Sequence, residues 1–222
     1  MRHRTVSDIM TTKVHTVDVT APAKTVAKVL DANGMTGLPV LNQIGEVVGV
    51  VTLTDLLHKI TYQDEQDDWP RLLRRHHVDR AKARAATAGE LMTAPAITIG
   101  PDASIVEAAA RLERHAIRRL PVVDSIGDLV GVLSRGDVIK VLTRPDAAIY
   151  VEVLSDVVER VLLLTPEAVE VQVTDGVVTL RGRLARRSEA VLVAALVRRI
   201  DGVIRVIDEL TFDDDDTQFV YL

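Results

Sequence analysis

A segment near the start of the chain recurs 82 positions later, and this internal repeat limits the folds that the chain can adopt. The match runs from Thr5 to Asp55 without a gap. The repeated positions include Met10 and Met92, Pro39 and Pro121, Gly49 and Gly131, and Asp55 and Asp137. Self-similarity of this kind predicts two copies of one supersecondary unit that bury a shared core.

Both copies predict the same order of elements, which is strand, helix, strand, strand, helix. In the first copy, Lys24–Ala32 carries apolar residues on one helical face, and in the second, Ser104 is suited to cap the corresponding helix. The stretches LPVLNQIGEVVGVVT and LPVVDSIGDLVGVLS each predict two strands joined by a turn that contains glycine. A last helix is expected to begin near Thr54 and near Arg135. The pattern predicts an α/β (α+β) fold.

A third unit follows Pro145 and Asp146, which interrupt the repeat. Asp175 and Gly176 favour a tight hairpin turn between two alternating strands. The predicted elements are a helix at 149–164, strands at 169–173 and 177–184, a helix at 187–200 and a strand at 203–212. We therefore expect a small αββαβ domain at the end of the chain.

The words shared by the two copies resemble those of the CBS domain. They are DIMT and ELMT at the opening, LPV before the hairpin, and GVVTLTD and GVLSRGD at its end. Two such copies in tandem resemble a Bateman module, over about residues 5–145. The resemblance implies two CBS repeats packed together, and it implies a homodimer because CBS pairs usually associate as disc-like dimers through their helices.

The third unit resembles the BON domain, through the words VQVTDGVVTLRGRL and VRRIDGVIRV. We therefore divide the chain into a first CBS motif at 1–61, a charged linker at 62–86, a second CBS motif at 87–145, a BON-like domain at 148–212 and an acidic tail at 213–222. Pro70 is expected to begin a helix in the linker. His76 and His77 are adjacent, so they diverge on a helix and no metal site is expected there.

The closing motifs of the two CBS copies, called here the closing words, are GVVTLTD and GVLSRGD. Each places a hydroxyl at a strand end and a carboxylate in the first turn of the next helix. In CBS proteins, this carboxylate typically accepts hydrogen bonds from ribose hydroxyls. The resemblance thus implies a regulatory adenine nucleotide, either AMP, ADP, ATP or S-adenosylmethionine. The implied ligand-binding residues are Thr52, Thr54, Asp55, Ser134, Arg135, Asp137, Met35, Thr36, Gly37, Ile117, Arg118 and Arg119.

The two implied sites differ in charge. Arg118, Arg119 and Arg135 in the second copy can offset phosphate charge, whereas Thr36 and Gly37 in the first are neutral. We therefore expect the second copy to be the better site. Helix capping is an open alternative, because acids in a first turn and hydroxyls before it also stabilise helices without any ligand.

Composition narrows the remaining choices of function. The chain has no cysteine, which excludes disulfides and thiolate catalysis, and it carries no P-loop or nucleophile elbow. A net charge of −5 and 3% aromatic residues make nucleic acid an unlikely partner. No apolar run is long enough to span a bilayer. We expect a cytoplasmic protein that is not an enzyme and needs no cofactor or metal.

The first hypothesis is a regulatory protein whose CBS pair senses an adenine nucleotide and passes that state to a partner through the BON-like domain. The alternative is a ligand-free dimeric scaffold whose BON-like domain binds proteins or phospholipid. Six arginines of that domain could face anionic headgroups, whereas the acidic run at 213–216 opposes this. These are Arg181, Arg183, Arg186, Arg187, Arg198 and Arg199.

Overall fold

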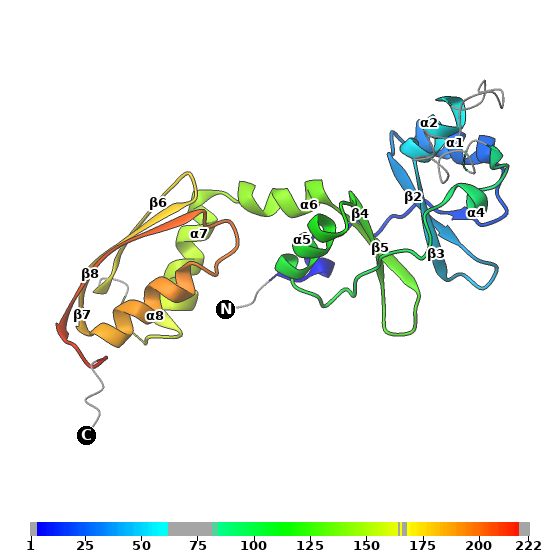
Figure 1. The fold of residues 1–222 in the computed structure, drawn as a ribbon. Helices are drawn as coiled ribbons and strands as arrows, with labels where there is room; N and C mark the ends of the chain where they lie inside the picture. The colour runs from blue at the N-terminus through cyan, green and yellow to red at the C-terminus, as the bar shows by residue number, and fades with distance from the viewer. Residues whose placement is uncertain (1–3, 62–81, 83, 164, 166–167, 218–222) are drawn as a thin grey trace, which may run out of the picture. The chain divides into compact units, whose positions relative to one another are not determined.

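The structure is a computed structural model that describes residues 4–61, 82, 84–163, 165 and 168–217. The chain divides into two compact units (Figure 1). Residues 5–135 form one unit, and residues 136–222 form the other together with the first four residues. The predicted helix at Pro70 and the histidine pair fall outside the described residues. The mixed α/β class predicted from the sequence is confirmed.

The first repeat is a three-stranded sheet with two helices. Strand β2 (Gly37–Leu41) is central, pairing in parallel with β1 (Val17–Asp18) and antiparallel with β3 (Val47–Thr52). Helix α1 (Ala23–Ala32) connects β1 to β2, and α2 (Leu53–Thr61) follows β3 directly. This is the predicted order of elements, and it brings α2 to begin at the very end of a strand.

The second repeat has the same plan with a shorter sheet. Helix α5 (Ile105–Arg114) starts at Ser104, whose side chain accepts a hydrogen bond from the Glu107 amide at 3.1 Å, as predicted for an N-cap. Strands β4 (Arg119–Val123) and β5 (Leu129–Ser134) form the antiparallel hairpin. The place of a first strand is taken by one parallel bridge between Ile99 and Val122.

The opening segments of the two repeats are exchanged, a feature that the sequence did not reveal. The first begins with a short 3-10 helix, η1 (Val6–Asp8), and the second with α4 (Ala88–Leu91). The η1 amides donate to loop carbonyls that precede α5, and α4 does the same to carbonyls that precede α1. Figure 1 shows η1, in dark blue, beside α5 and α4 beside the first sheet.

The exchange continues into the sheets. Thr11 and Val132 donate to each other's carbonyl at 3.0 and 2.9 Å, and Thr93 and Val50 form the equivalent pair of hydrogen bonds at 2.9 and 3.1 Å. Leu91 is fully buried within the hydrophobic core of the first repeat. Each repeat therefore contributes backbone hydrogen bonds and apolar side chains to the other.

Helix α6 (Arg135–Ile139) follows β5, and a 3-10 segment, η3 (Lys140–Thr143), continues it. The boundary between the two compact units falls inside α6, after Arg135. Val141 is buried, and its carbonyl lies 3.2 Å from where a Cβ of Gly202 would stand. The end of the second repeat is thus packed within the same unit as the C-terminal domain.

The C-terminal domain has the predicted order of helix, strand, strand, helix and strand. Its elements are α7 (Asp146–Glu152), β6 (Glu170–Thr174), β7 (Val177–Arg186), α8 (Arg187–Val197) and β8 (Arg205–Asp214). Strand β7 is central, antiparallel to β6 and parallel to β8. The first helix differs from the prediction, because after Glu152 it continues as a π-helical segment over Val153–Glu159.

The predicted hairpin turn is present at Asp175 and Gly176, with φ angles of 51° and 73°. Both amides of this turn donate to the carboxylate of Asp146, at 2.8 and 2.9 Å. Arg144 bonds the Asp201 carbonyl at 2.6 Å and pairs with Glu152 at 2.8 Å. These polar contacts hold the start of the domain against two of its later turns.

Candidate functional site

The carboxylate of Asp55 is the central feature of the first repeat. It lies in the first turn of α2, and within the described part of the chain it is the buried charged residue, 5% exposed. Its Oδ2 accepts hydrogen bonds from the amide and the hydroxyl of Thr52, both at 2.7 Å. The expected pairing of strand-end hydroxyl and first-turn carboxylate therefore exists. The bond from the Thr52 amide to the Asp55 carboxylate is also half of a capping box, so helix capping and ligand binding would use the same carboxylate.

Lys82, from the segment between the repeats, forms an ion pair with Asp55 Oδ1. The two side chains are 12% and 7% exposed. The Lys82 ammonium also donates to Thr93 Oγ1 at 3.2 Å. Lys82 is not among the site residues predicted from the sequence, because its only distinguishing feature there is its place in the charged linker.

The segments before the two hairpins meet each other. The Arg119 guanidinium donates to Thr36 Oγ1 at 3.1 Å and to the Gly37 carbonyl at 3.4 Å. The structure thereby brings together three implied ligand residues from both repeats. Met35, which precedes them, is partly buried against the first core, and Thr54 is exposed on α2.

The cationic residues of the second repeat are not equally available to an anion. Arg135 donates to the carbonyls of Ile117 and Leu112, at 2.9 and 3.3 Å, so its guanidinium is committed to the end of α5. Arg118 is exposed. This difference could not be predicted from the sequence, because hydrogen bonds to backbone carbonyls leave no pattern in the side chains.

Ser134 ends β5 in the first compact unit, whereas Asp137 lies in the first turn of α6 in the second unit. Asp137 is paired with Lys140 at 3.0 Å. This lysine side chain is 76% exposed, in contrast to the nearly buried Lys82. The two carboxylates at matching positions of the repeat therefore have different cationic neighbours.

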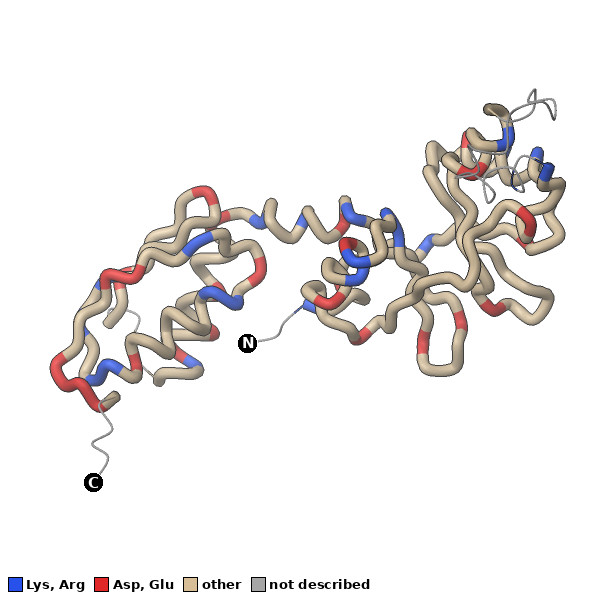
Figure 2. Tube along the Cα trace, in the orientation of Figure 1, with Lys and Arg blue, Asp and Glu red and all other residues tan. Residues whose placement is uncertain are grey.

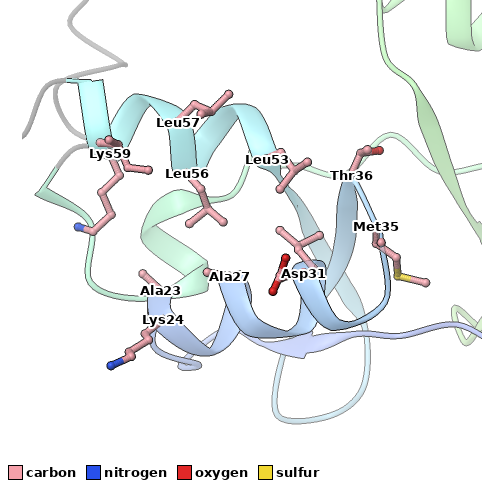
Figure 3. Close-up of a pocket in the computed structure, with 13 residues that line it drawn as sticks. Ala23, Lys24, Ala27, Asp31, Met35, Thr36, Leu53, Leu56, Leu57 and Lys59 are labelled. Atoms are coloured by element: carbon pink, nitrogen blue, oxygen red, sulfur yellow. The ribbon is translucent and has the colours of Figure 1, made fainter.

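An apolar groove of about 700 Å³ runs between α1 and α2 of the first repeat (Figure 3). Leu53, Leu57 and Ile60 line it and are 40%, 58% and 69% exposed. Asp31 and Lys59 stand at its borders, one from each helix. Apolar side chains at this level of exposure mark a surface suited to a partner.

Two arginines of strand β7 are paired with acids of β8, and Figure 2 marks the charged positions along this domain. Arg181 pairs with Glu209, and this hydrogen bond raises the pKa of Arg181. Arg183 pairs with Asp213. The expectation that these two arginines face anionic headgroups is therefore weakened, because their charge is already compensated.

The acidic tail docks at the start of α8. Asp215 pairs with Arg187 at 2.7 Å, and Asp216 accepts from the amide and hydroxyl of Ser188 at 2.9 and 2.6 Å. A hydrogen bond from Thr217, with a further one from Arg187, lowers the pKa of Asp215 to about 2. The hydrogen bonds from Ser188 lower the pKa of Asp216.

Comparison with known proteins identifies the family. The CBS domain matches residues 6–62 and 88–144, and the BON domain matches residues 145–214. The chain therefore belongs to the CBS-domain family, as a tandem CBS pair followed by a BON domain. In the described part of the chain, no helix has the length and apolar character needed to cross a membrane.

Solved structures of CBS pairs share the fold. The structure of CBSX2 in complex with AMP is 30% identical, with a TM-score of 0.54, and the match covers 67% of this chain and 99% of that chain. The CBS pair of MJ0100, in complex with 5′-methylthioadenosine and S-adenosyl-L-methionine, is 21% identical with a TM-score of 0.52, covering 64% and 98%.

Two relatives in sequence match about three fifths of this chain. A homoserine O-acetyltransferase of Methanococcoides burtonii is 33% identical over 138 residues, which are 62% of this chain and 24% of that protein. The chloroplastic CBS domain-containing protein CBSX1 of Arabidopsis thaliana is 30% identical, with 61% and 62% covered. The chain thus spans about a quarter of the acetyltransferase, and the match does not transfer that enzyme's activity.

Proposed function

We propose that this chain is a non-catalytic regulatory protein of the cytoplasm whose CBS pair binds an adenine nucleotide. The observation that carries the proposal is the buried Asp55 carboxylate, held by Thr52 where β3 passes into α2. A charged acceptor bonds vicinal ribose hydroxyls more strongly than a neutral one. The likeness to CBSX2, whose structure contains AMP, supports this choice of ligand class.

The residues before the hairpins supply the rest of the first site in this proposal. Thr36 and the Gly37 backbone lie together with Arg119, whose guanidinium can meet phosphate oxygens. Met35 offers an apolar surface for the base. Ser134, Arg118 and Asp137 would serve corresponding roles in the second repeat.

Calorimetric titration of AMP, ADP, ATP and S-adenosylmethionine tests the proposal. We expect at least one of these ligands to bind wild type, and Asp55→Asn or Asp137→Asn to weaken binding at its own repeat about tenfold or more, as expected for a charged hydrogen bond. Asp102→Asn, at an exposed carboxylate outside both closing words, is the control. Absence of binding across the panel would reject the sensor.

We also propose that the state of the CBS pair reaches a partner through the BON domain. Residues 136–144 lie within the CBS match and in the same compact unit as the BON domain. Arg144 fastens this segment to Glu152 and Asp201. A ligand contact at Asp137 would therefore act on a helix that is continuous with the BON unit.

The apolar groove between α1 and α2 is proposed to bind a second copy of the chain. An isologous dimer needs a self-complementary surface. The groove meets that need because Leu53, Leu57 and Ile60 form its apolar part, while Asp31 and Lys59 carry opposite charges at its borders. Two copies related by a two-fold axis can then place each acid near a lysine of the other.

One observation favours the second candidate function, a ligand-free dimeric scaffold. Asp55 is already paired with Lys82, so its charge is compensated without any nucleotide. Under this alternative, the closing words serve helix capping, and the BON domain binds a protein. Loss of all nucleotide binding, with a stable dimer and a captured BON partner, would select it.

A further inference from the structure

The ion pair between Lys82 and Asp55 occupies the atom that a ribose would need. Thr52 already uses Oδ2 of the carboxylate through two hydrogen bonds of 2.7 Å. The remaining oxygen, Oδ1, faces the Lys82 ammonium. A diol that approaches Asp55 must therefore share Oδ1 with a cation or displace it.

Lys82 is held in this position by the segment that follows it. The Ala85 amide donates to the Lys82 carbonyl at 3.2 Å, and the side chain of Ala85 is buried in the first core. The Ala85 carbonyl accepts from the Lys59 ammonium of α2 at 2.6 Å. Ala86 accepts from the amide of Ala23, which begins α1, at 2.8 Å. The backbone segment that follows Lys82 is thus anchored to both helices of the first repeat.

Among the described residues, Asp137 has a different cationic neighbour from Asp55. The lysine that does pair with Asp137 is Lys140, three residues along the same stretch and 76% exposed. Water can replace such an exposed ammonium at little cost in free energy. The Lys82 side chain is only 12% exposed, so its loss leaves the charge of a buried carboxylate uncompensated.

We propose that Lys82 is an intrachain competitor for ribose at Asp55, which makes the two ligand sites of the CBS pair unequal. This inference rests on the proposed nucleotide function. The first repeat binds a nucleoside only by displacing Lys82 or by sharing Oδ1 with it, so its affinity is lower than its carboxylate would otherwise give. Lys82 is a specificity-determining residue that does not itself need to touch the ligand.

The test measures binding of adenosine and AMP to the full chain by calorimetry, in an Asp137→Asn background that weakens the second site. Lys82→Met and Lys82→Gln are compared with the unchanged lysine, and Lys140→Met is the matched control. Adenosine isolates the diol because it has no phosphate to attract the lysine. We expect both Lys82 variants to bind adenosine about tenfold more tightly and Lys140→Met to bind it unchanged.

A second ligand separates competition from a general loosening of the fold. The gain should vanish with 2′-deoxyadenosine, which offers a single hydroxyl to the carboxylate. If adenosine or AMP binds in an Asp55-dependent manner and both Lys82 variants bind equally or more weakly, the competitor is rejected while the nucleotide site stands. If no form of the chain binds either ligand, both the competitor and the nucleotide function are rejected.

Discussion

Met10 lies over Gly131, so that a Cβ atom added at this glycine would stand 2.5 Å from the methionine sulfur. The equivalent relation joins Met92 to Gly49, at 2.4 Å, so each methionine contacts the strand of the other repeat. We expect Gly131→Ala and Gly49→Ala each to lower the free energy of unfolding by about 1 to 3 kcal/mol through overpacking.

Urea unfolding measures this effect. Gly100→Ala is the control, because a Cβ there meets no atom within 4 Å and its φ angle is not in the left-handed region. Equal stability of all three variants would show that the methionines move aside without cost.

Arg119 links the two segments that precede the hairpins, and its removal should have two separable effects. Arg119→Ala loses its hydrogen bonds to Thr36 and Gly37, which should destabilise the fold by about 1 kcal/mol. It should also weaken AMP about tenfold while leaving adenosine unchanged, since only AMP carries phosphate. Calorimetry on Arg119→Ala and on the exposed Arg118→Ala compares the two cations. An equal loss for both ligands would mean that Arg119 only positions the segment.

The groove between α1 and α2 predicts a dimer that a single charge can dissociate. Leu57→Glu places a carboxylate on the exposed apolar wall, where dimer formation would bury it without a partner. We expect light scattering after gel filtration to show a dimer for wild type and a monomer for this variant. Ile44→Glu, at a hairpin turn that is 78% exposed, should remain dimeric. A wild-type monomer would refute the interface.

The acidic tail should leave α8 in acid. The pKa of Asp215 is lowered to about 2 in the folded protein, from an ordinary value of 3.8, by hydrogen bonds from Thr217 and Arg187. The Thr217 bond lies within the tail, whereas the Arg187 bond joins it to α8, so the Arg187 contribution stabilises docking above the ordinary value and is lost as the pH falls from about 3.8 to about 2. Amide chemical shifts at Ser188 and Thr217 should follow this window. In the Asp215→Asn variant, the same chemical shifts should show no titration in this pH window, because the carboxylate is absent.

Paired arginines should also suppress binding to anionic lipid. We expect wild type not to sediment with phosphatidylserine vesicles at about 0.15 M salt, where exposed charges are screened within about 8 Å. Asp213→Asn combined with Asp215→Asn frees Arg183 and Arg187 and should raise the sedimented fraction. Neutral phosphatidylcholine vesicles provide the control. Strong binding by wild type would contradict the compensation of charge.

The sequence predicted the elements well because apolar periodicity and turn residues act locally. Lys24–Ala32 and the Ser104 cap are both present as predicted, with α1 extended by one residue. The exchanged openings could not be predicted, since Met10 and Met92 look identical whichever repeat they contact. Lys82 was missed for a related reason, because its pairing with Asp55 depends on how the chain returns after the linker.

The exchange of openings has a consequence for how such a protein can be divided. A fragment that ends in the linker contains the first repeat with Met10, but it lacks Leu91, which packs in the core of that first repeat. The complementary fragment contains the second repeat but lacks the η1 segment. Each half therefore lacks a segment that its own repeat needs, and that segment is contained in the other half. Two separately expressed halves should therefore recognise each other through the exchanged segments.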